Sequence, residues 1–314
     1  MPENTPVFLK DISERDKPWD AHRRNAETVQ GFYGMDRSGE FERLAQRMGD
    51  CSKLLELALR DGEDGEQHFK LAHARFCRVR HCPVCQWRRS LMWVARTKKA
   101  LPRILNDYPN HRWIFLTLTV RNPLIQDLRD SIQSMNKAFV KLTKRKVWPG
   151  VGWLKSLEVT CPKDIDYAHP HFHVLVMVPN SYFQGKYYLS QEKWVDLWSS
   201  CLGVDYSPVV DVRAVKPMKG DLKQGVEKAI AETFKYSVKE ADLVLDAQWL
   251  LELTAQMHNA RSVGIGGCFR EYFSENEPED LINCDDLPDG EETSDAHLFF
   301  PWDPQYRRYR LIKE

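Results

Sequence analysis

The sequence of 314 residues lacks any run of 18 or more apolar residues, and its polar N-terminal stretch contains no apolar signal core. A membrane-spanning helix needs about 20 consecutive apolar residues, so we expect neither a membrane span nor export. Internal repeats and long low-complexity stretches are also missing, which leaves periodicity as the guide to structure. At this length the chain can bury a sizeable core, and we expect a cytoplasmic, globular protein.

A net charge is also missing, since 45 Lys and Arg balance 45 Asp and Glu. The balance conceals an asymmetry: residues 67–148 hold eighteen basic residues against three acids, whereas residues 271–300 hold eleven acids and no Lys or Arg. Tryptophans are interleaved with the basic block, namely Trp87, Trp93, Trp113 and Trp148. This combination is typical of a nucleic-acid surface, although a solvated helical face would carry the same charge.

Eight cysteines in a chain without an export signal argue against a disulfide framework. Three of them crowd together with the spacing C-x4-C-x2-C, namely Cys77, Cys82 and Cys85. The last two form CPVC, a common zinc knuckle, but a structural zinc ion takes four ligands. One ligand is therefore missing, and His73 and His81 are candidates on proximity. Three reduced cysteines without a metal are the alternative.

Periodicity predicts the elements along the chain. Residues 1–66 look helical and polar. Strands are expected at 113–120, 153–160, 169–178 and 207–215, and helices at 125–148, 191–200 and about 220–245. The short loop CPKDIDYA between the second and third strands predicts an antiparallel hairpin.

This order predicts an α+β fold with a central antiparallel β-sheet and helices packed mainly on one face, together with an N-terminal helical zinc-binding element. We divide the chain into an N-terminal helical, zinc-binding and DNA-contacting region (1–105), a catalytic domain (106–270) and an acidic C-terminal segment (271–314). The acidic stretch 271–300 is expected to be flexible or peripheral, because it is poor in apolar residues.

Three histidines alternate in the predicted strand HPHFHVLVMV, so His169, His171 and His173 share one face. Two imidazoles on one strand can chelate a divalent ion, and a carboxylate on the neighbouring strand would complete a facial ligand set. Glu158 is the candidate carboxylate. A chance histidine pair at a strand end is the alternative.

A second polar constellation lies in KAIAETFKYSVKEADL, residues 228–243. If this segment is helical, Glu232, Tyr236 and Lys239 project from one face. An opposing apolar stripe would seat the helix on the sheet: Ile230, Phe234, Val238, Ala241 and Leu245. A tyrosine hydroxyl, with a free pKa of about 10, attacks effectively when a metal polarises a phosphate and a cation such as Lys239 stabilises the charge. An ordinary solvated helix face is the alternative.

Together these segments resemble the replication initiator proteins of small rolling-circle bacterial plasmids, a branch of the His-hydrophobe-His (HUH) endonuclease superfamily. The segments FLTLTV, EVT and PHFHVLVMV resemble that family's conserved strands, and the pattern E-x3-Y-x2-K at residues 232–239 resembles its nucleophile motif. The cysteine run FCRVRHCPVCQWRRS resembles an N-terminal element of this branch. The matches spread over residues 50–245 in the family's order, and they imply a ferredoxin-like core.

The resemblance implies a mechanism. His171 and His173, with Glu158, would hold Mg²⁺ or Mn²⁺ against a scissile phosphate of single-stranded or hairpin origin DNA. Tyr236 would attack that phosphate, giving a 5′-phosphotyrosine and a free 3′-OH that primes replication, and DNA ends would later be rejoined. Glu232 would activate water, or otherwise assist the second cleavage. Origin DNA, a host helicase and the replication machinery of a bacterial cytoplasm are the implied partners.

The resemblance also makes Cys51 the first choice for the fourth zinc ligand. A zinc ion would fix the neighbouring arginines as a surface for DNA phosphates: Arg75, Arg78, Arg80, Arg88 and Arg89. His169 departs from the two-histidine motif, and we expect it outside the ligand set.

Tyr187 and Tyr188 form a rival nucleophile pair, but they lie outside the motif. An HUH transposase or conjugative relaxase would share the metal motif; relaxases carry the tyrosine before the histidines, whereas Tyr236 follows them here. A zinc-containing DNA-binding regulator without catalysis is the alternative of a different class, and it would bind DNA without Mg²⁺ or Mn²⁺ and never cleave it.

Overall fold

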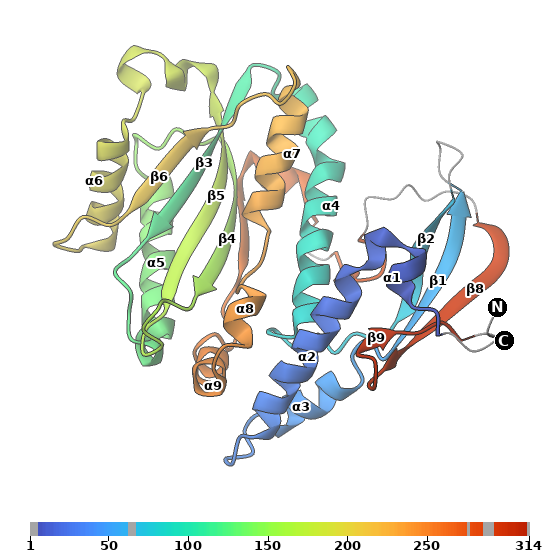
Figure 1. Ribbon diagram of the computed structural model, residues 1–314. Coiled ribbons are helices and arrows are strands. Elements are labelled where there is room, and N and C mark those ends of the chain that lie inside the picture. Colours follow the sequence, from blue (N-terminus) through green and yellow to red (C-terminus); the bar gives the residue numbers. More distant parts are fainter. Residues whose placement is uncertain (1–5, 62–66, 275–276, 285–291, 313–314) are drawn as a thin grey trace. The chain divides into compact units, whose positions relative to one another are not determined.

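The computed structural model describes residues 6–61, 67–274, 277–284 and 292–312, and the chain divides into two compact units (Figure 1). The first unit comprises Met1–Ala95, Leu243–Leu251 and Glu279–Glu314, and the second comprises Arg96–Asp242 and Glu252–Pro278. None of the helices within the described ranges has the length and hydropathy that crossing a membrane requires.

The first unit combines helices with a small antiparallel sheet. Its helices are α1 (Leu9–Ile12), α2 (Pro18–Gly34), α3 (Glu42–Gly49) and the start of α4 (Pro83–Asp107). The sheet has the order β2-β1-β8-β9, formed by β2 (Gln67–Ala74), β1 (Leu54–Asp61), β8 (Glu292–Asp303) and β9 (Arg308–Tyr309). The two short helices α8 (Glu240–Leu243) and α9 (Ala247–Gln256) lie where the chain passes between the units.

This sheet corrects two predictions. Among the described residues of 1–66, the helices end at Gly49, because Leu55 and Leu57 of β1 are buried in the core and the backbone of β1 pairs with β2 and β8 on its two sides. The stretch 271–300 is not peripheral in its described part, since β8 is a central strand of the sheet. The hydroxyl of the buried Tyr309 donates to the carbonyl of Ser52 at 2.7 Å.

The second unit contains the larger sheet and confirms the α+β prediction. Its strand order is β6-β3-β5-β4-β7, all antiparallel, formed by β6 (Val210–Ala214), β3 (His111–Thr119), β5 (His169–Pro179), β4 (Gly152–Thr160) and β7 (Val263–Gly267). The predicted hairpin of β4 and β5 is confirmed, whereas β7 was not predicted. The helices of this unit are α5 (Leu128–Thr143), α6 (Gln191–Leu202) and α7 (Leu222–Thr233), with the remainder of α4.

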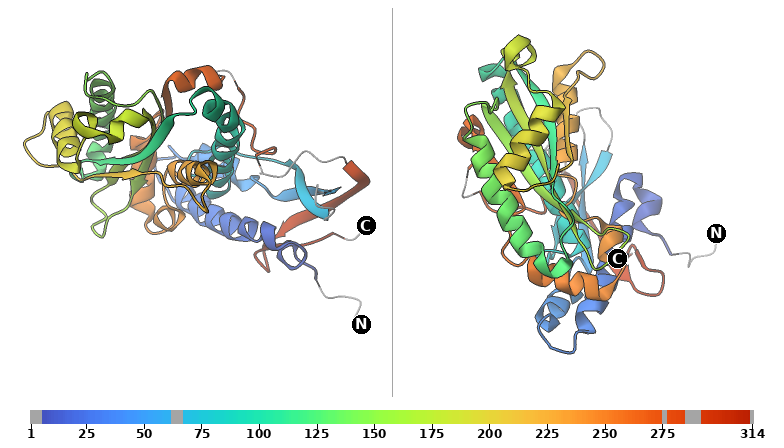
Figure 2. Two further views of the ribbon diagram at one scale, coloured as in Figure 1. Left: turned by 90° about the horizontal axis from the view of Figure 1, so that it is seen from above. Right: turned by 90° about the vertical axis from the view of Figure 1, so that its left-hand side faces the viewer.

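Helices lie on both faces of this sheet, rather than mainly on one. On the α5 face, the ring of Phe139 packs against Trp153 at 4.9 Å and Phe172 at 6.0 Å between centroids. On the opposite face, the Ser156 hydroxyl donates to the carbonyl of Thr233 at the end of α7. In the right-hand view of Figure 2, α5 and α6 lie in front of the strands and α7 lies behind them. The open part of the α7 face is where the predicted metal ligands project.

The predicted helix from about 220 to 245 is wrong. It ends at Thr233, whose hydroxyl donates to the Ala229 carbonyl at 2.8 Å, a bond that competes with helix continuation. The chain then runs beside β4: Val159 and Val238 form a parallel bridge, and the Val159 N–H donates to the Ser237 carbonyl at 2.9 Å. Pairing with the end of a strand has overridden the helical periodicity of the sequence.

A lysine is buried in the core between the sheet and α5. The Lys155 ammonium donates to the Asn136 side-chain oxygen at 2.6 Å and lies 3.9 Å from the centroid of the Phe172 ring. Burial, with a smaller contribution from the charge of Arg261, lowers the pKa of Lys155 to about 8 from 10.5. Between these two values the unfolded chain binds more protons than the folded chain, so this group makes stability rise with pH.

We expect Lys155→Met to raise the free energy of unfolding near pH 7 by about 1 to 2 kcal/mol. Keeping this lysine charged in the folded protein costs about 3 kcal/mol of stability by linkage, and the substitution removes that cost. Loss of the hydrogen bond to Asn136 offsets about 1 kcal/mol of the gain in stability. Urea unfolding at pH 7 and at about pH 9.5 measures both the gain and its pH dependence. The wild-type protein should gain more stability than the variant between the two pH values; equal pH dependence in both proteins would contradict the account.

Candidate active site

Glu158, His171 and His173 come together on the α7 face of the large sheet. Glu158 on β4 lies directly opposite His171 on β5, and His173 lies two residues further along the same face. One carboxylate oxygen, Oε2 of Glu158, lies 3.1 Å from His171 Nε2 and 2.8 Å from His173 Nε2. The three candidate ligand atoms all lie within 4.8 Å of one another. The hairpin register therefore produces a group that can share one divalent ion.

The surroundings of this group keep Glu158 ionised and orient the imidazoles. Burial alone would raise the pKa of Glu158, but hydrogen bonds with His171 and His173 outweigh it and hold the pKa well below its usual range. The Nδ1 atom of His171 lies 3.3 Å from the His169 carbonyl, and that of His173 lies 3.4 Å from the Thr117 hydroxyl. Partners at Nδ1 fix the rings and direct both Nε2 atoms to the same point.

His169 lies beside the group but outside it. Its Nδ1 pairs with the Asn122 side-chain oxygen at 2.7 Å, and its ring centroid is 5.1 Å from that of His171. Burial lowers the pKa of His169, and the charges of His171 and Lys239 act in the same direction. Lys239 follows Val238, whose bridge partner Val159 lies opposite Pro170, so the backbone of Lys239 lies near the histidine end of β5. Neither Thr117 nor Asn122 was predicted, because only the strand pairing brings them to the histidines.

Tyr236 is carried on the segment that follows α7, and three hydrogen bonds fix this segment to the end of β4. Ser156 bonds Thr233, the Val159 N–H bonds the Ser237 carbonyl at 2.9 Å, and the Cys161 N–H donates to the Asp242 carboxylate at 2.9 Å. Glu158 lies within this stretch of β4, and Tyr236 lies within the fixed segment. The structure thus brings the backbone of the candidate nucleophile to the strand that carries a candidate metal ligand.

The three residues of the predicted nucleophile motif do not share a helix face. Glu232 is in the last turn of α7, exposed, and 3.8 Å from the ammonium of Lys235; Lys239 is exposed just before α8. Tyr236 is partly buried in irregular backbone, where burial, and then the charge of Glu240, raise its pKa. The protein alone therefore keeps this phenol protonated near neutral pH, so nucleophilic attack would need activation by a cation or a base at the site.

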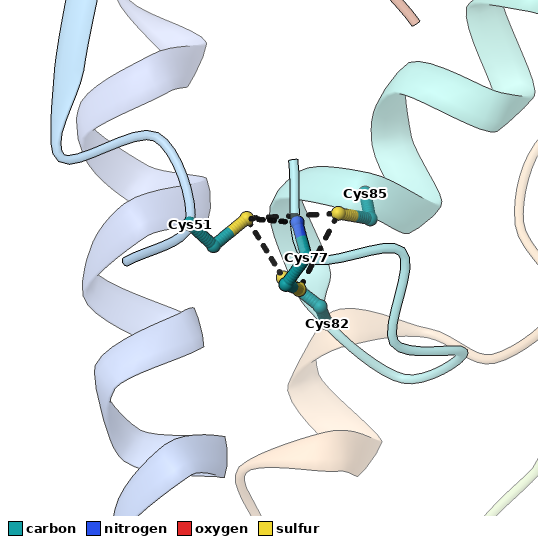
Figure 3. Close-up of side chains that lie close together, drawn as sticks. All are labelled: Cys51, Cys77, Cys82 and Cys85. Carbon is teal, nitrogen blue, oxygen red and sulfur yellow. Dashed lines mark hydrogen bonds between the residues drawn. The ribbon is translucent and has the colours of Figure 1, made fainter. Parts of the chain in front are cut away.

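In the first unit, four cysteine side chains converge (Figure 3). Cys51 follows α3, and the others lie in the loop before α4 and in its first turn: Cys77, Cys82 and Cys85. The Sγ atom of Cys51 is 3.6 Å from that of Cys85 and 3.7 Å from that of Cys82. All four are buried, and their sulfur atoms lie within 4.8 Å of one another. Four converging thiols match the ligand number of a structural zinc site.

Backbone groups around the cluster favour thiolates. The Arg78 N–H donates to Cys85 Sγ at 3.3 Å, which Arg78 achieves with a positive φ of 56°. Burial raises the pKa of the Cys82 thiol, so a bound cation is what would displace its proton. The two histidine alternatives lie outside the group. His73 is exposed on β2, and His81 is buried, with a pKa lowered to about 3 mainly by that burial.

The arginines predicted to face DNA have different positions. Arg88 contradicts the expectation: it is 1% exposed, donates to the Leu281 and Ile282 carbonyls at 2.8 Å, and lies 5.3 Å from the Trp19 ring centroid. A buried guanidinium group needs hydrogen-bond acceptors. Arg88 finds them in two backbone carbonyls of the chain that follows α9, and these bonds hold that chain in place. Residues 279–284, expected to be peripheral, are thereby fixed to α4.

Of the other four arginines, Arg89 is ion-paired with Glu279, which also lies 3.8 Å from exposed Arg78. Burial, and then the charge of Arg89, lower the pKa of Arg80 from its ordinary value. Arg75 is the most exposed of the five, and it forms an ion pair with Asp50 at 3.3 Å. The expected arginine surface is thus reduced to Arg75 and Arg78 as exposed side chains.

The rival tyrosines lie at the other end of β5 from the histidines. Tyr187 and Tyr188 are 59% and 49% exposed and follow Pro179, the last residue of the strand. The six steps along the strand from His173 to Pro179 span roughly 20 Å. Both tyrosines are therefore far from the candidate metal ligands along the strand, in contrast to Tyr236.

An antiparallel sheet that presents a His-hydrophobe-His pair and a glutamate on one face is consistent with the HUH class of replication proteins. The chain belongs to the Replication protein family, the plasmid rolling-circle replication initiators, because the model of that family matches residues 68–310. It is 35% identical to a protein rep of Streptococcus pneumoniae serotype 2 over 93% of this chain and 91% of the relative. A protein rep of Bacillus amyloliquefaciens is 32% identical over 98% of both chains. No solved structure matches the chain.

Proposed function

We propose that this replication initiator nicks one strand of a plasmid origin through a 5′-phosphotyrosine on Tyr236, and later rejoins the single-stranded ends. The observation that carries the proposal is the attachment of the Tyr236 segment to β4 beside Glu158. Membership of the family supports the replication role. The geometry supports the chemistry, because the segment that carries the candidate nucleophile is hydrogen-bonded to the strand that carries a candidate metal ligand.

Glu158, His171 and His173 fit a divalent cation, since one ionised oxygen and two Nε2 atoms converge on a single point. We propose Mn²⁺ or Mg²⁺ here, because a carboxylate suits both ions and open positions remain for phosphate. The bound ion would supply charge neutralisation at the scissile phosphate. The protein's own contribution is to hold the carboxylate ionised and the two imidazoles fixed.

In the cleavage step, the Tyr236 oxygen forms a bond to phosphorus while the bond from phosphorus to the 3′ oxygen breaks. The phenol loses its proton to solvent, and the departing 3′ oxygen takes up a proton to become the 3′-OH. Lys239, an exposed residue that follows the bridge between Val238 and Val159, would stabilise the charge on the phosphate. Rejoining is the reverse attack by a 3′-OH, and Glu232 would assist the second cleavage by activating water.

We further propose that Cys51, with the three cysteines of the loop and α4, holds a structural Zn²⁺. Four buried thiols with an N–H donor to one sulfur atom support this ion over a harder one. The exposed Arg75 and Arg78, which flank Cys77, would contact DNA phosphates from this element. A host helicase would act on the nicked product.

The test is incubation of the full chain with a 5′- and 3′-labelled single-stranded oligonucleotide from the plasmid's origin. With Mn²⁺ or Mg²⁺ we expect a protein band linked to the 5′-phosphate side, and a free 3′-OH fragment of defined length. Omitting the divalent ion should abolish both products. Tight binding without cleavage under any ionic condition would instead favour a non-catalytic DNA-binding role.

A further inference from the structure

A cavity of about 240 Å³ lies in the second unit, between the loop that precedes β4 and the loop that follows β5. Its volume is below the roughly 300 Å³ of small ligand pockets, so it suits one flat ring system better than a complete cofactor. The side chains that define it are Lys146, Trp148, Pro179, Tyr182, Lys186 and Tyr187. It lies at the end of β5 opposite to the histidines, so the proposed cleavage chemistry does not use it.

The floor of this cavity is aromatic and fixed in place. Tyr182 is buried, and its hydroxyl accepts a hydrogen bond from Trp194 Nε1 at 3.1 Å. The ring of Trp148 packs edge-on against Trp194 at 5.9 Å and Phe139 at 6.1 Å. Tyr187, 59% exposed, forms an open wall. The fixed ring of Trp148 and the exposed ring of Tyr187 can stack against the faces or an edge of a planar ligand.

The rim of the cavity is basic. Lys146 and Lys186 are exposed, the lining includes no Asp or Glu, and neither lysine is ion-paired among the residues that the structure describes. Lys186 lies 5.4 Å from the centroid of the Tyr187 ring. Lys144 and Arg145 precede Lys146 in the same loop. The ligand that fits these groups is flat, aromatic and attached to a negative charge, as a nucleotide of single-stranded DNA is.

We propose that this cavity binds a nucleotide of the origin strand that lies away from the scissile phosphate, with its base stacked on Tyr187 and Trp148 and its phosphates near Lys146 and Lys186. The inference rests on the proposed function for the identity of the DNA. His173 and Pro179 are separated by roughly 20 Å of strand, so the bound nucleotide would lie several nucleotides away from the scissile phosphate. The cavity would thus fix the register of the DNA strand, and so help to determine which phosphate lies at the cleavage site.

The experiment compares binding of a fluorescent oligothymidylate about 20 nucleotides long to the wild-type chain and to variants, at several salt concentrations. We expect Tyr187→Ala to weaken binding roughly ten- to hundredfold with an unchanged salt slope, because a stacking contact is lost. Lys146→Gln should weaken binding mildly and reduce the salt slope by about one, because one phosphate contact is lost. If either residue had only a structural role, its substitution would not lower the affinity and change the salt slope in these two different ways.

Tyr306→Ala is the matched control, since Tyr306 is a tyrosine of similar exposure, 47%, that lies in the first unit and outside the lining. Wild-type affinity in Tyr187→Ala, or an equal loss in Tyr306→Ala, would overturn the proposal. With an origin oligonucleotide, Tyr187→Ala should raise the DNA concentration needed for half-maximal cleavage and leave the saturated rate unchanged. Failure of the wild-type chain to cleave would refute the proposed function, whereas the oligothymidylate comparison would still decide whether the cavity binds DNA.

Discussion

Tyr236→Phe is expected to abolish the covalent protein–DNA adduct and to reduce cleavage of an origin oligonucleotide by about 10⁴-fold or more, as loss of a catalytic nucleophile does. The substitution removes one oxygen and keeps the ring, whose partial burial contributes to the packing of the segment. Stability and affinity for the oligonucleotide should therefore stay within about twofold of wild type. Gel separation of the labelled adduct and anisotropy measure the two quantities on the same samples.

Tyr188→Phe is the control for this prediction, because Tyr188 is an exposed tyrosine at the opposite end of β5. It should form the adduct at the wild-type rate. An adduct that survives in Tyr236→Phe and disappears in a variant of Tyr187 or Tyr188 would transfer the nucleophile to the rival pair. Mass-spectrometric mapping of the tyrosine that carries the nucleotide distinguishes these outcomes directly.

The sequence predicts those residues of the site whose positions follow from the alternation of side chains along a β-strand. His171 and His173 are two apart, so a strand places them on one face, and the short connection to the preceding strand predicts which residues lie opposite. Glu158 follows from that register, and the structure confirms the hairpin. No contact distant in sequence is needed to reach these three residues.

The position of Tyr236 could not be predicted in the same way. Of the predicted apolar stripe, Ala241 and Leu245 are exposed, whereas Ile230, Phe234 and Val238 are buried. Their burial, however, comes from a helix that ends at Thr233 and from a strand-like segment paired with Val159. A pattern read over one segment cannot detect a hydrogen-bond partner that lies some eighty residues earlier in the chain.

Long-range pairing also explains why charge was a poor guide to exposure. Arg88 belongs to the most basic stretch of the sequence, yet its partners are carbonyl groups 193 and 194 residues away. Strand β8 likewise pairs with β1 across most of the chain, although the acidic composition around it predicts a peripheral segment. The acidic stretch is thus partly a structural component of the first unit, with Glu279 neutralising Arg89.

The four-cysteine cluster leads to the second large effect, Cys51→Ser. If these thiols hold Zn²⁺, the substitution should reduce bound zinc from about one ion per chain to well below one and lower the melting temperature by roughly 10 °C or more, because metal binding contributes directly to folding. Cys51 is the ligand most distant in sequence from the other three, so its bond to the ion would tie the end of α3 to the start of α4.

Elemental analysis and thermal unfolding of matched samples measure both effects of Cys51→Ser. Cys201→Ser is the control, since Cys201 is buried in α6 and belongs to no cluster among the residues described. That variant should keep its zinc and lose only the modest stability that follows from placing a hydroxyl in an apolar site. A wild-type protein without zinc, or a Cys51→Ser variant that retains it fully, would show that the four thiols are reduced core cysteines. Zinc that is lost from Cys51→Ser and retained in Cys201→Ser would support a four-cysteine zinc site that ties the end of α3 to the loop carrying Arg75 and Arg78.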